Sequence, residues 1–162
     1  YTKNAMDKQK TKEEVLDFLN KHVVAVLATS SKANAPHAAA LYYVVDKDFN
    51  FFFLTKSNTQ KFANITENNK VALVVVDHAS PKSVEVEGTV DLALDDVKQR
   101  EVVNKISEKS AKLGEAFWPP PVSQLQGGEL IVFKVSPSEL CFCDYPHGES
   151  GKANILQIIP KF

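Results

Sequence analysis

The chain has 162 residues, of which 44% are hydrophobic and 24% are charged, and its formal net charge is −1. This length and composition predict a single domain over residues 1–162 with a substantial core. The near-neutral charge gives no polyanion-binding surface, so nucleic acid is excluded as the expected main partner. Arg100 is the only arginine. A phosphate site in this chain must therefore use lysine, hydroxyl and backbone N–H groups.

The cysteine content and the hydropathy indicate the cellular compartment of the protein. Cys141 and Cys143 are the only cysteines, which is too few for a disulfide framework and favours a reducing compartment. The first residues, YTKNAMDKQKTK, are polar and lack the apolar segment of a signal peptide. No window approaches the roughly 20 apolar residues of a membrane-spanning helix. We therefore expect a cytoplasmic protein with no membrane partner.

The first third of the chain predicts one helix and three strands. Thr11 and Glu14 form a capping box at the start of TKEEVLDFLNK, whose apolar stripe is typical of an amphipathic helix. The segments 23–30, 38–46 and 51–55 are apolar and separated by short polar turns. Three strands joined in this way predict an antiparallel meander.

A second helix and two strands follow. Ser57 and Gln60 form another capping box, which predicts a helix to about Asn68. Residues 71–77 then predict a continuous apolar strand, and residues 83–94 alternate between an apolar face and a face that carries acidic side chains. Such alternation is typical of a half-buried strand. Its expected buried face holds Val84, Val86, Val90, Leu92 and Leu94, and its exposed face Glu85, Glu87 and Asp91.

The last third of the chain predicts one long helix and two strands. Asp95 is the expected N-cap of a helix that ends near Leu113, with Gly114 as its stop. The next segment, WPPPVSQLQGG, is too rich in proline for a helix or a central strand. Strands are expected at 129–135 and 139–145. About seven strands and three helices, with few parallel crossovers, predict a mainly β fold in which helices flank an antiparallel barrel.

The polar loop KSNTQK, residues 56–61, is a candidate anion site. The N-terminus of a helix presents unpaired N–H groups and a positive dipole end, which suit a phosphate. Thr55, Ser57 and Thr59 add hydroxyl groups, and Lys61 adds an ammonium group. A lysine in the first turn is unfavourable with the helix dipole, which favours an anion nearby. The alternative is a capped helix with a solvated lysine, which is the commoner arrangement.

The CFC motif is a second candidate. Cys141 and Cys143 share one face of the expected strand because side chains alternate there. With His147 they make at most three metal ligands, fewer than a closed zinc site needs. We therefore expect structural cysteines and no metal. The other three histidines have no metal-ligand spacing.

Trp118 follows Phe117 and precedes three prolines, so it belongs to an aromatic pair in a stiff loop. This pair either covers the barrel or a subunit contact, or stacks on a planar ligand. The sequence contains no glycine-rich phosphate loop and no GxSxG or HExxH motif. Hydrolase chemistry therefore has no support.

The order strand–turn–strand–turn–strand, followed by T-x-x-x-[ST]-x-K at a helix start, resembles the pyridoxamine 5′-phosphate oxidase-like FMN-binding split barrels. The resemblance covers roughly residues 12–145 and includes the small bacterial members known as general stress proteins. It implies an antiparallel split barrel that forms a homodimer, with FMN held at the subunit interface. It is carried by PHAAALYYVVD, FFFLTKSNTQKFANITENNKVALVVVD, SVEVEGTV and ELIVFKVSPSELCFCDY.

The same resemblance implies which residues bind FMN. The second strand lies along the isoalloxazine ring, the loop and helix start after the third strand grip the phosphate, and a later strand gives a polar contact. Trp118 is added because it can stack on a planar ligand. The candidate cofactor-binding residues are His37, Ala38, Ala39, Ala40, Leu41, Tyr42, Leu54, Thr55, Thr59, Gln60, Lys61, Ser83 and Trp118.

The chain departs from the family pattern at three places. The family usually has arginines at the positions of Gln60 and His37, and the segment GKANILQIIPKF lacks the tryptophan- and arginine-rich substrate motif of the true oxidases. Oxidation of pyridoxamine phosphate is therefore not expected. We expect an FMN-binding oxidoreductase of unknown substrate, whose redox chemistry resides in the flavin and whose catalytic residues cannot be named. The alternatives are a non-catalytic flavin or haem binding or storage protein, with His37 or His147 as axial ligand, and a dimeric barrel whose site has decayed.

Overall fold

The computed structural model describes residues 2–113, 127–145 and 154–160. This part of the chain forms three helices and seven strands. In chain order they are α1 (Thr2–Lys21), β1 (Val24–Ser30), β2 (Pro36–Val45), β3 (Phe51–Lys56), α2 (Gln60–Glu67), β4 (Lys70–Val76), β5 (Lys82–Asp91), α3 (Asp96–Ala111), β6 (Leu130–Asp144) and β7 (Asn154–Ile159).

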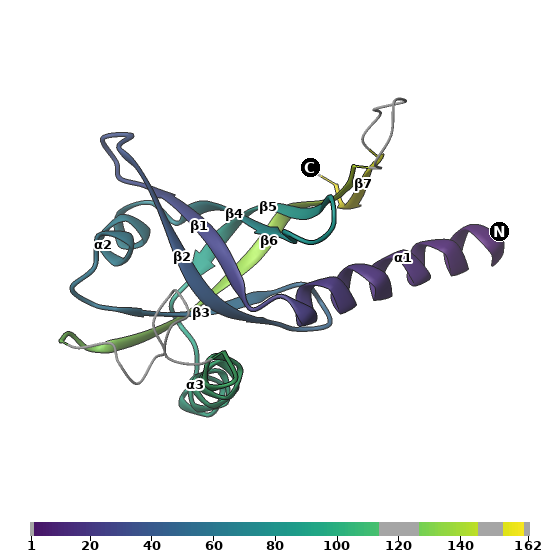
Figure 1. The fold of residues 1–162 in the computed structure, drawn as a ribbon. Coiled ribbons are helices and arrows are strands. Elements are labelled where there is room, and N and C mark those ends of the chain that lie inside the picture. Colours follow the sequence, from purple (N-terminus) through teal and green to yellow (C-terminus); the bar gives the residue numbers. More distant parts are fainter. Residues whose placement is uncertain (1, 114–126, 146–153, 161–162) are drawn as a thin grey trace.

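The strands form one antiparallel sheet in the order β3-β2-β1-β4-β5-β6-β7. β3 also pairs with β6, from Phe51 opposite Val135 to Lys56 opposite Leu130. This pairing closes β1 to β6 into a barrel, and β7 extends the sheet beyond it (Figure 1). The prediction of a mainly β split barrel with flanking helices is confirmed.

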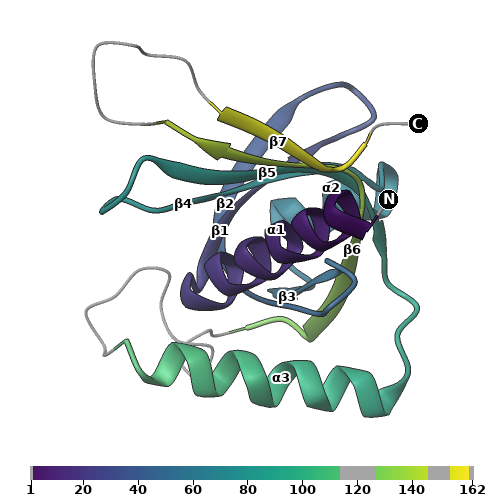
Figure 2. The ribbon, with the colours of Figure 1, turned by 90° about the vertical axis from the view of Figure 1, so that its right-hand side faces the viewer.

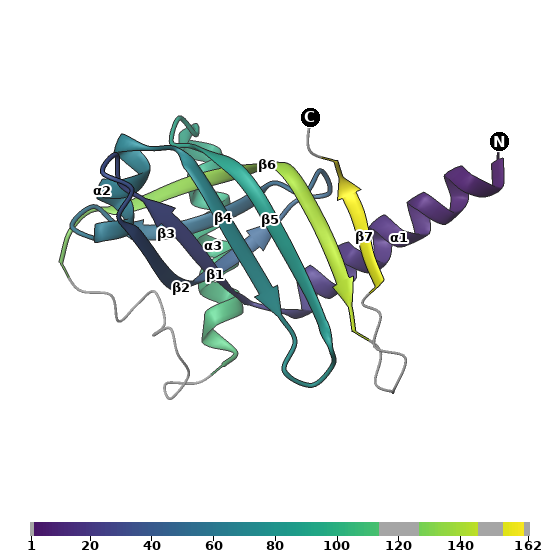
Figure 3. The ribbon, with the colours of Figure 1, turned by 90° about the horizontal axis from the view of Figure 1, so that it is seen from above.

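The helices lie on different sides of the barrel. α2 lies at one end, and α1 projects from the opposite end (Figure 1). α3 runs along the outside of the barrel (Figure 2). The strands β4, β5, β6 and β7 lie side by side when the molecule is seen from above (Figure 3). None of the described helices is both long and apolar enough to cross a membrane.

The barrel interior is filled by the inward-facing half of each strand, because side chains alternate between the two faces. Phe51 and Phe53 of β3 are fully buried, and the ring of Phe53 stacks on that of Phe133 with 5.3 Å between centroids. The hydroxyl of Tyr43 donates a 2.7 Å hydrogen bond to the carbonyl of Leu19. This bond ties the C-terminal end of α1 to the barrel.

A second apolar cluster lies between the outer surface of the barrel and α3. Phe52 and Leu54 alternate with the inward-facing residues of β3 and contribute to this cluster, as do Val102 and Ile106 of α3. The ammonium group of Lys98 lies 4.6 Å from the centroid of the Phe52 ring, within cation–π range. α3 therefore covers the outer surface of β3.

Two predicted capping boxes are wrong. Thr11 lies inside α1, which begins at Thr2. α2 is capped by Thr59, whose hydroxyl accepts from the N–H of Phe62 at 3.3 Å. Ser57 cannot cap the helix because its N–H donates to the carbonyl of Glu129 and its hydroxyl accepts from the N–H of that residue. The pairing between β3 and the start of β6 therefore continues past Lys56 and delays the helix.

The two strands predicted at 129–135 and 139–145 form the single strand β6. Pro137 pairs with Gly88 of β5, at the point where the register shifts. Such irregularities accommodate a proline inside a sheet, since it lacks an N–H for the ladder. The seventh strand is instead β7, which was not predicted and pairs with the end of β6.

The half-buried character of β5 is confirmed, because Val84, Val86 and Val90 are buried whereas Glu85, Glu87 and Thr89 are exposed. The predicted alternation fails beyond Asp91, where the strand ends. Leu92 is 39% exposed, because it has left the sheet.

The start of α3 is as predicted. The carboxylate of Asp95 accepts from the N–H of Lys98 at 2.8 Å and caps the helix. The helix ends at Ala111, and its predicted stop, Gly114, lies outside the described residues.

A close contact between β5 and β6 makes glycine necessary at position 88. A Cβ atom added to Gly88 would lie 2.6 Å from the carbonyl oxygen of Ser136, closer than any relaxed contact. We therefore expect Gly88→Ala to lower the free energy of unfolding by about 1–3 kcal/mol, the usual cost of overpacking. Urea denaturation checks this, with the exposed neighbour Thr89→Ala as the control. Equal stability of the Gly88→Ala and Thr89→Ala variants would contradict it.

Candidate cofactor site

The end of β3 and the start of α2 form a compact polar turn. Thr55 is 2% exposed, and its hydroxyl oxygen lies 3.0 Å from that of Thr59. Thr59 donates its own proton to the carbonyl of Lys56 at 2.9 Å, so Thr55 is the donor in the pair. Both hydroxyl protons are thus used within the turn, and the hydroxyl groups give it a fixed shape.

The first turn of α2 supplies N–H donors for an anion. Capping uses the N–H of Phe62, and the N–H of Ala63 donates to the carbonyl of Thr59 at 3.1 Å. The N–H groups of Gln60 and Lys61 come earlier in the helix and have no intrahelical acceptor. Two adjacent N–H groups at the positive end of a helix dipole suit a phosphate oxygen.

Lys61 adds a positive charge to the same turn. Its side chain is half-buried, and this burial lowers the pKa of its ammonium group. None of the ion pairs found among the described residues involves Lys61. An anion bound beside Lys61 would offset the cost of burying the charge. The second lysine of the turn, Lys56, donates instead to the carbonyl of Gly128 at 3.3 Å.

The side chain of Gln60 lies along α2 and points toward Asn64. Its side-chain amide donates to the side-chain oxygen of Asn64 at 2.9 Å. Asn64 in turn donates to the hydroxyl of Thr29 on β1 at 3.0 Å. Asn64 and Thr29 are 2% and 4% exposed. The sequence did not predict a role for either residue. The four-residue spacing of Gln60 and Asn64 could have suggested their contact on one helix, whereas the contact between Asn64 and Thr29 joins residues far apart in the sequence.

The candidate residues of β2 divide between two faces of the sheet. Tyr42 lies in the cluster beneath α3, whereas Leu41 points into the barrel. By alternation, Ala38 and Ala40 share the outer face with Tyr42. His37 and Ala39 share the inner face with Leu41. The six side chains therefore cannot all line one face of a planar ring.

His37 lies beside the polar residues of α2. It pairs with Thr29 across β1 and β2, and directly opposite residues project from the same face of the sheet. The Nδ1 atom of His37 is buried and finds no hydrogen-bond partner among the described residues. Leu54, by contrast, lies on the outer face with Tyr42.

Ser83 lies apart from the other candidates. It belongs to β5, where it pairs with Val76 and Cys143. The strands β4 and β1 separate it from β2, a distance of about 14 Å for three strand spacings. A single chain therefore does not bring Ser83 to the start of α2. Trp118 lies outside the described residues.

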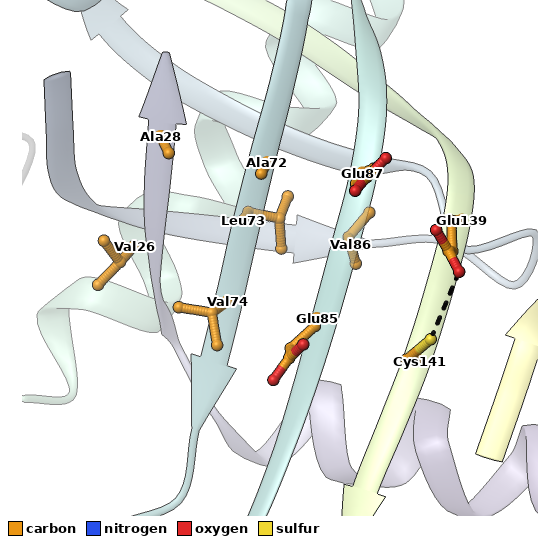
Figure 4. A pocket seen from close by; sticks show the side chains of 10 residues that line it. All are labelled: Val26, Ala28, Ala72, Leu73, Val74, Glu85, Val86, Glu87, Glu139 and Cys141. Carbon is orange, nitrogen blue, oxygen red and sulfur yellow. Dashed lines mark hydrogen bonds between the residues drawn. The ribbon is translucent and has the colours of Figure 1, made fainter. Parts of the chain in front are cut away.

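The outer face of β1 and β4 is apolar and exposed. Val26 and Val76 are 42% and 46% exposed. A cavity of about 540 Å³ lies on this face (Figure 4). Figure 4 shows apolar side chains on β1 and β4, and carboxylates on the neighbouring β5 and β6. The residues that line it are Val26, Ala28, Ala72, Leu73, Val74, Glu85, Val86, Glu87, Glu139 and Cys141.

Cys141 and Cys143 are free thiols on β6. Burial raises the pKa of both thiols, the carboxylate of Glu85 raises both further, and that of Glu139 raises the pKa of the Cys141 thiol. Thiols of this kind are protonated and unreactive at neutral pH. The described residues contain no group of three or more histidine, cysteine, aspartate or glutamate side chains that could hold a metal ion.

Comparisons with known proteins agree with this fold. Residues 11–139 match the family model described as pyridoxamine 5′-phosphate oxidase. Among solved structures, general stress protein 26 from Bacillus anthracis is 19% identical, with 90% of this chain and 98% of that chain covered and a TM-score of 0.60. The haem storage protein from Vibrio cholerae is 17% identical, with 77% and 88% covered and a TM-score of 0.59.

An F420 reductase is 24% identical to this chain, with 73% of this chain and 88% of that chain covered and a TM-score of 0.56. At identities below 25%, these three structures show the fold alone. No curated protein matches the sequence.

Proposed function

Because this chain belongs to the pyridoxamine 5′-phosphate oxidase family, we propose that it is a cytoplasmic FMN-binding flavoprotein that acts as an oxidoreductase. The observation that carries this proposal is Lys61, a half-buried cation in the first turn of α2 that belongs to none of the ion pairs found among the described residues. The chain's residues fit a phosphate at this turn through one ammonium group and two N–H groups. The free thiols of Cys141 and Cys143 suit a reducing compartment.

The flavin supplies the redox chemistry, and the protein binds and orients it. The turn from Thr55 to Lys61 holds the phosphate, and its internal hydrogen bonds keep that turn in one shape. The small side chains Ala38 and Ala40 leave room for a flat ring to approach the outer face of β2. Tyr42 and Leu54, which belong to the cluster beneath α3, form an apolar border beside these alanines.

A second copy of the chain completes the site in this proposal. The outer face of β1 and β4 exposes an apolar strip, and such surfaces mark interaction sites. Ser83 is too far from α2 to act in the same chain, so a contact between Ser83 and the flavin requires the partner's copy of that residue. The proposed assembly is therefore a homodimer with the flavin at the subunit interface.

Haem is the second candidate ligand, and one observation favours it. The buried Nδ1 atom of His37 has no hydrogen-bond partner among the described residues, and a neutral imidazole nitrogen can ligate haem iron. One of the similar structures is a haem storage protein. In this alternative the barrel binds or stores haem and no redox reaction is catalysed.

The phosphate contact gives the first test of the proposal. We expect Lys61→Ala to weaken FMN binding about ten- to a hundredfold, because a charge-assisted contact is lost. Riboflavin lacks the phosphate and should bind almost as before. Quenching of flavin fluorescence measures both dissociation constants. Lys105→Ala, which removes an equal charge on α3, is the control and should change neither value. Equal weakening of FMN and riboflavin by Lys61→Ala would contradict a phosphate contact.

The apolar strip gives a test of the homodimer. We expect Val26→Asp to convert the dimer to monomer and to release the flavin, because a carboxylate would be buried in an apolar interface. Val97→Asp is the matched control, since Val97 is 72% exposed on α3 and lies away from this strip. Light scattering gives the mass of each variant. A monomeric wild-type protein that retains its flavin would contradict the proposed assembly.

A further inference from the structure

A chain of hydrogen bonds runs from the exposed Gln60 at the start of α2, through the buried Asn64 and Thr29, to the first strands of the barrel. Gln60 donates to Asn64 at 2.9 Å, and Asn64 donates to Thr29 at 3.0 Å. The hydroxyl of Thr29 donates a hydrogen bond to the carbonyl of His37 at 3.4 Å. Two candidate cofactor residues, Gln60 and His37, are thus joined by two residues that have no direct role in binding the cofactor.

The orientation of each member is fixed by its neighbours. Asn64 is 2% exposed, and its carboxamide uses its oxygen toward Gln60 and its nitrogen toward Thr29. A flipped carboxamide would require the Gln60 amide to flip as well and the Thr29 hydroxyl to turn from the carbonyl of His37 toward Asn64. Buried polar groups without partners are costly, so Asn64 and Thr29 are held together as one unit.

This arrangement has two consequences for the first turn of α2. The bond from Asn64 to Thr29 fixes the helix against β1, and with it the direction in which the N–H groups of Gln60 and Lys61 point. The bond from Gln60 to Asn64 keeps the Gln60 side chain along the helix, away from the turn that begins at Thr55. Lys61 and the N–H groups are then the donors presented to an anion.

We propose that Asn64 and Thr29 are positioning residues of the cofactor site, which set the geometry of phosphate recognition without touching the phosphate. This inference rests on the proposed binding of FMN. A purely structural role would stabilise α2 and affect every ligand of the barrel equally. A positioning role affects the phosphate group selectively, because the N–H groups and the ammonium group must converge on one anion.

The replacements of Thr29 test the inference. Thr29→Val keeps the shape of the side chain and removes the hydroxyl, so Asn64 loses its acceptor. We expect FMN to bind about tenfold more weakly, because the N–H groups and the ammonium group no longer converge on one anion, and riboflavin to change less than about twofold. Thr29→Ser restores the hydroxyl and should restore the preference for FMN. In the protein without flavin, Thr29→Val should also speed amide hydrogen exchange at Phe62 and Ala63, whose N–H groups donate to Thr59.

Ile65→Val is the matched control. Ile65 is a 2% exposed residue of the same helix that packs into the barrel core. Its truncation loosens α2 without touching the polar network, so any loss of affinity should be equal for FMN and riboflavin.

The outcomes separate this inference from the proposed function. If the wild-type protein prefers FMN and the Thr29→Val variant keeps the full preference, the positioning role is overturned and the proposed function stands. The positioning role is also overturned if Thr29→Ser behaves like Thr29→Val. If the wild-type protein binds FMN no better than riboflavin, the proposed phosphate site fails, and this inference fails with it.

Discussion

The pairing of β3 with β6 is the constraint on which the candidate site depends. It closes the barrel, and it extends beyond Lys56 through the paired backbone hydrogen bonds of Ser57 and Glu129. The chain can turn into α2 only after this ladder ends, so Thr59 becomes the cap. The same pairing fixes Thr55 at the start of the turn, where its hydroxyl forms a hydrogen bond with that of Thr59. The polar turn is therefore held in place by a strand that lies far along the sequence.

The partial burial of the Lys61 ammonium group and the hydrogen bonds within the turn together determine which groups are proposed to bind the phosphate. Lys61 is partly withdrawn from water, and none of the ion pairs found among the described residues involves it. Charged groups are buried in proteins when a partner offsets the cost. The hydroxyl protons of Thr55 and Thr59 are already used inside the turn. The proposed phosphate contacts are therefore the ammonium group of Lys61 and the first N–H groups of α2.

Periodicity along the chain predicted the barrel, because alternating or continuous apolar segments define strands whatever their partners are. Periodicity could not predict features that depend on contacts between residues far apart in the sequence. Serine and threonine are both common N-cap residues, so the sequence alone does not choose between Ser57 and Thr59. The contact of Ser57 with Glu129 leaves Thr59 as the cap. The SPSE segment resembles a turn, but the register shift opposite Gly88 keeps it in one strand. The candidate residues Thr55, Thr59, Gln60 and Lys61 do share one turn, whereas their link to Thr29 is purely tertiary.

The identity of the bound cofactor tests the account most directly. The measurement is the absorption spectrum of protein purified in its native state, together with the mass of the cofactor released on denaturation. The account predicts a flavin spectrum and release of FMN. A Soret band with release of haem would contradict it, and so would a colourless protein that does not retain added FMN.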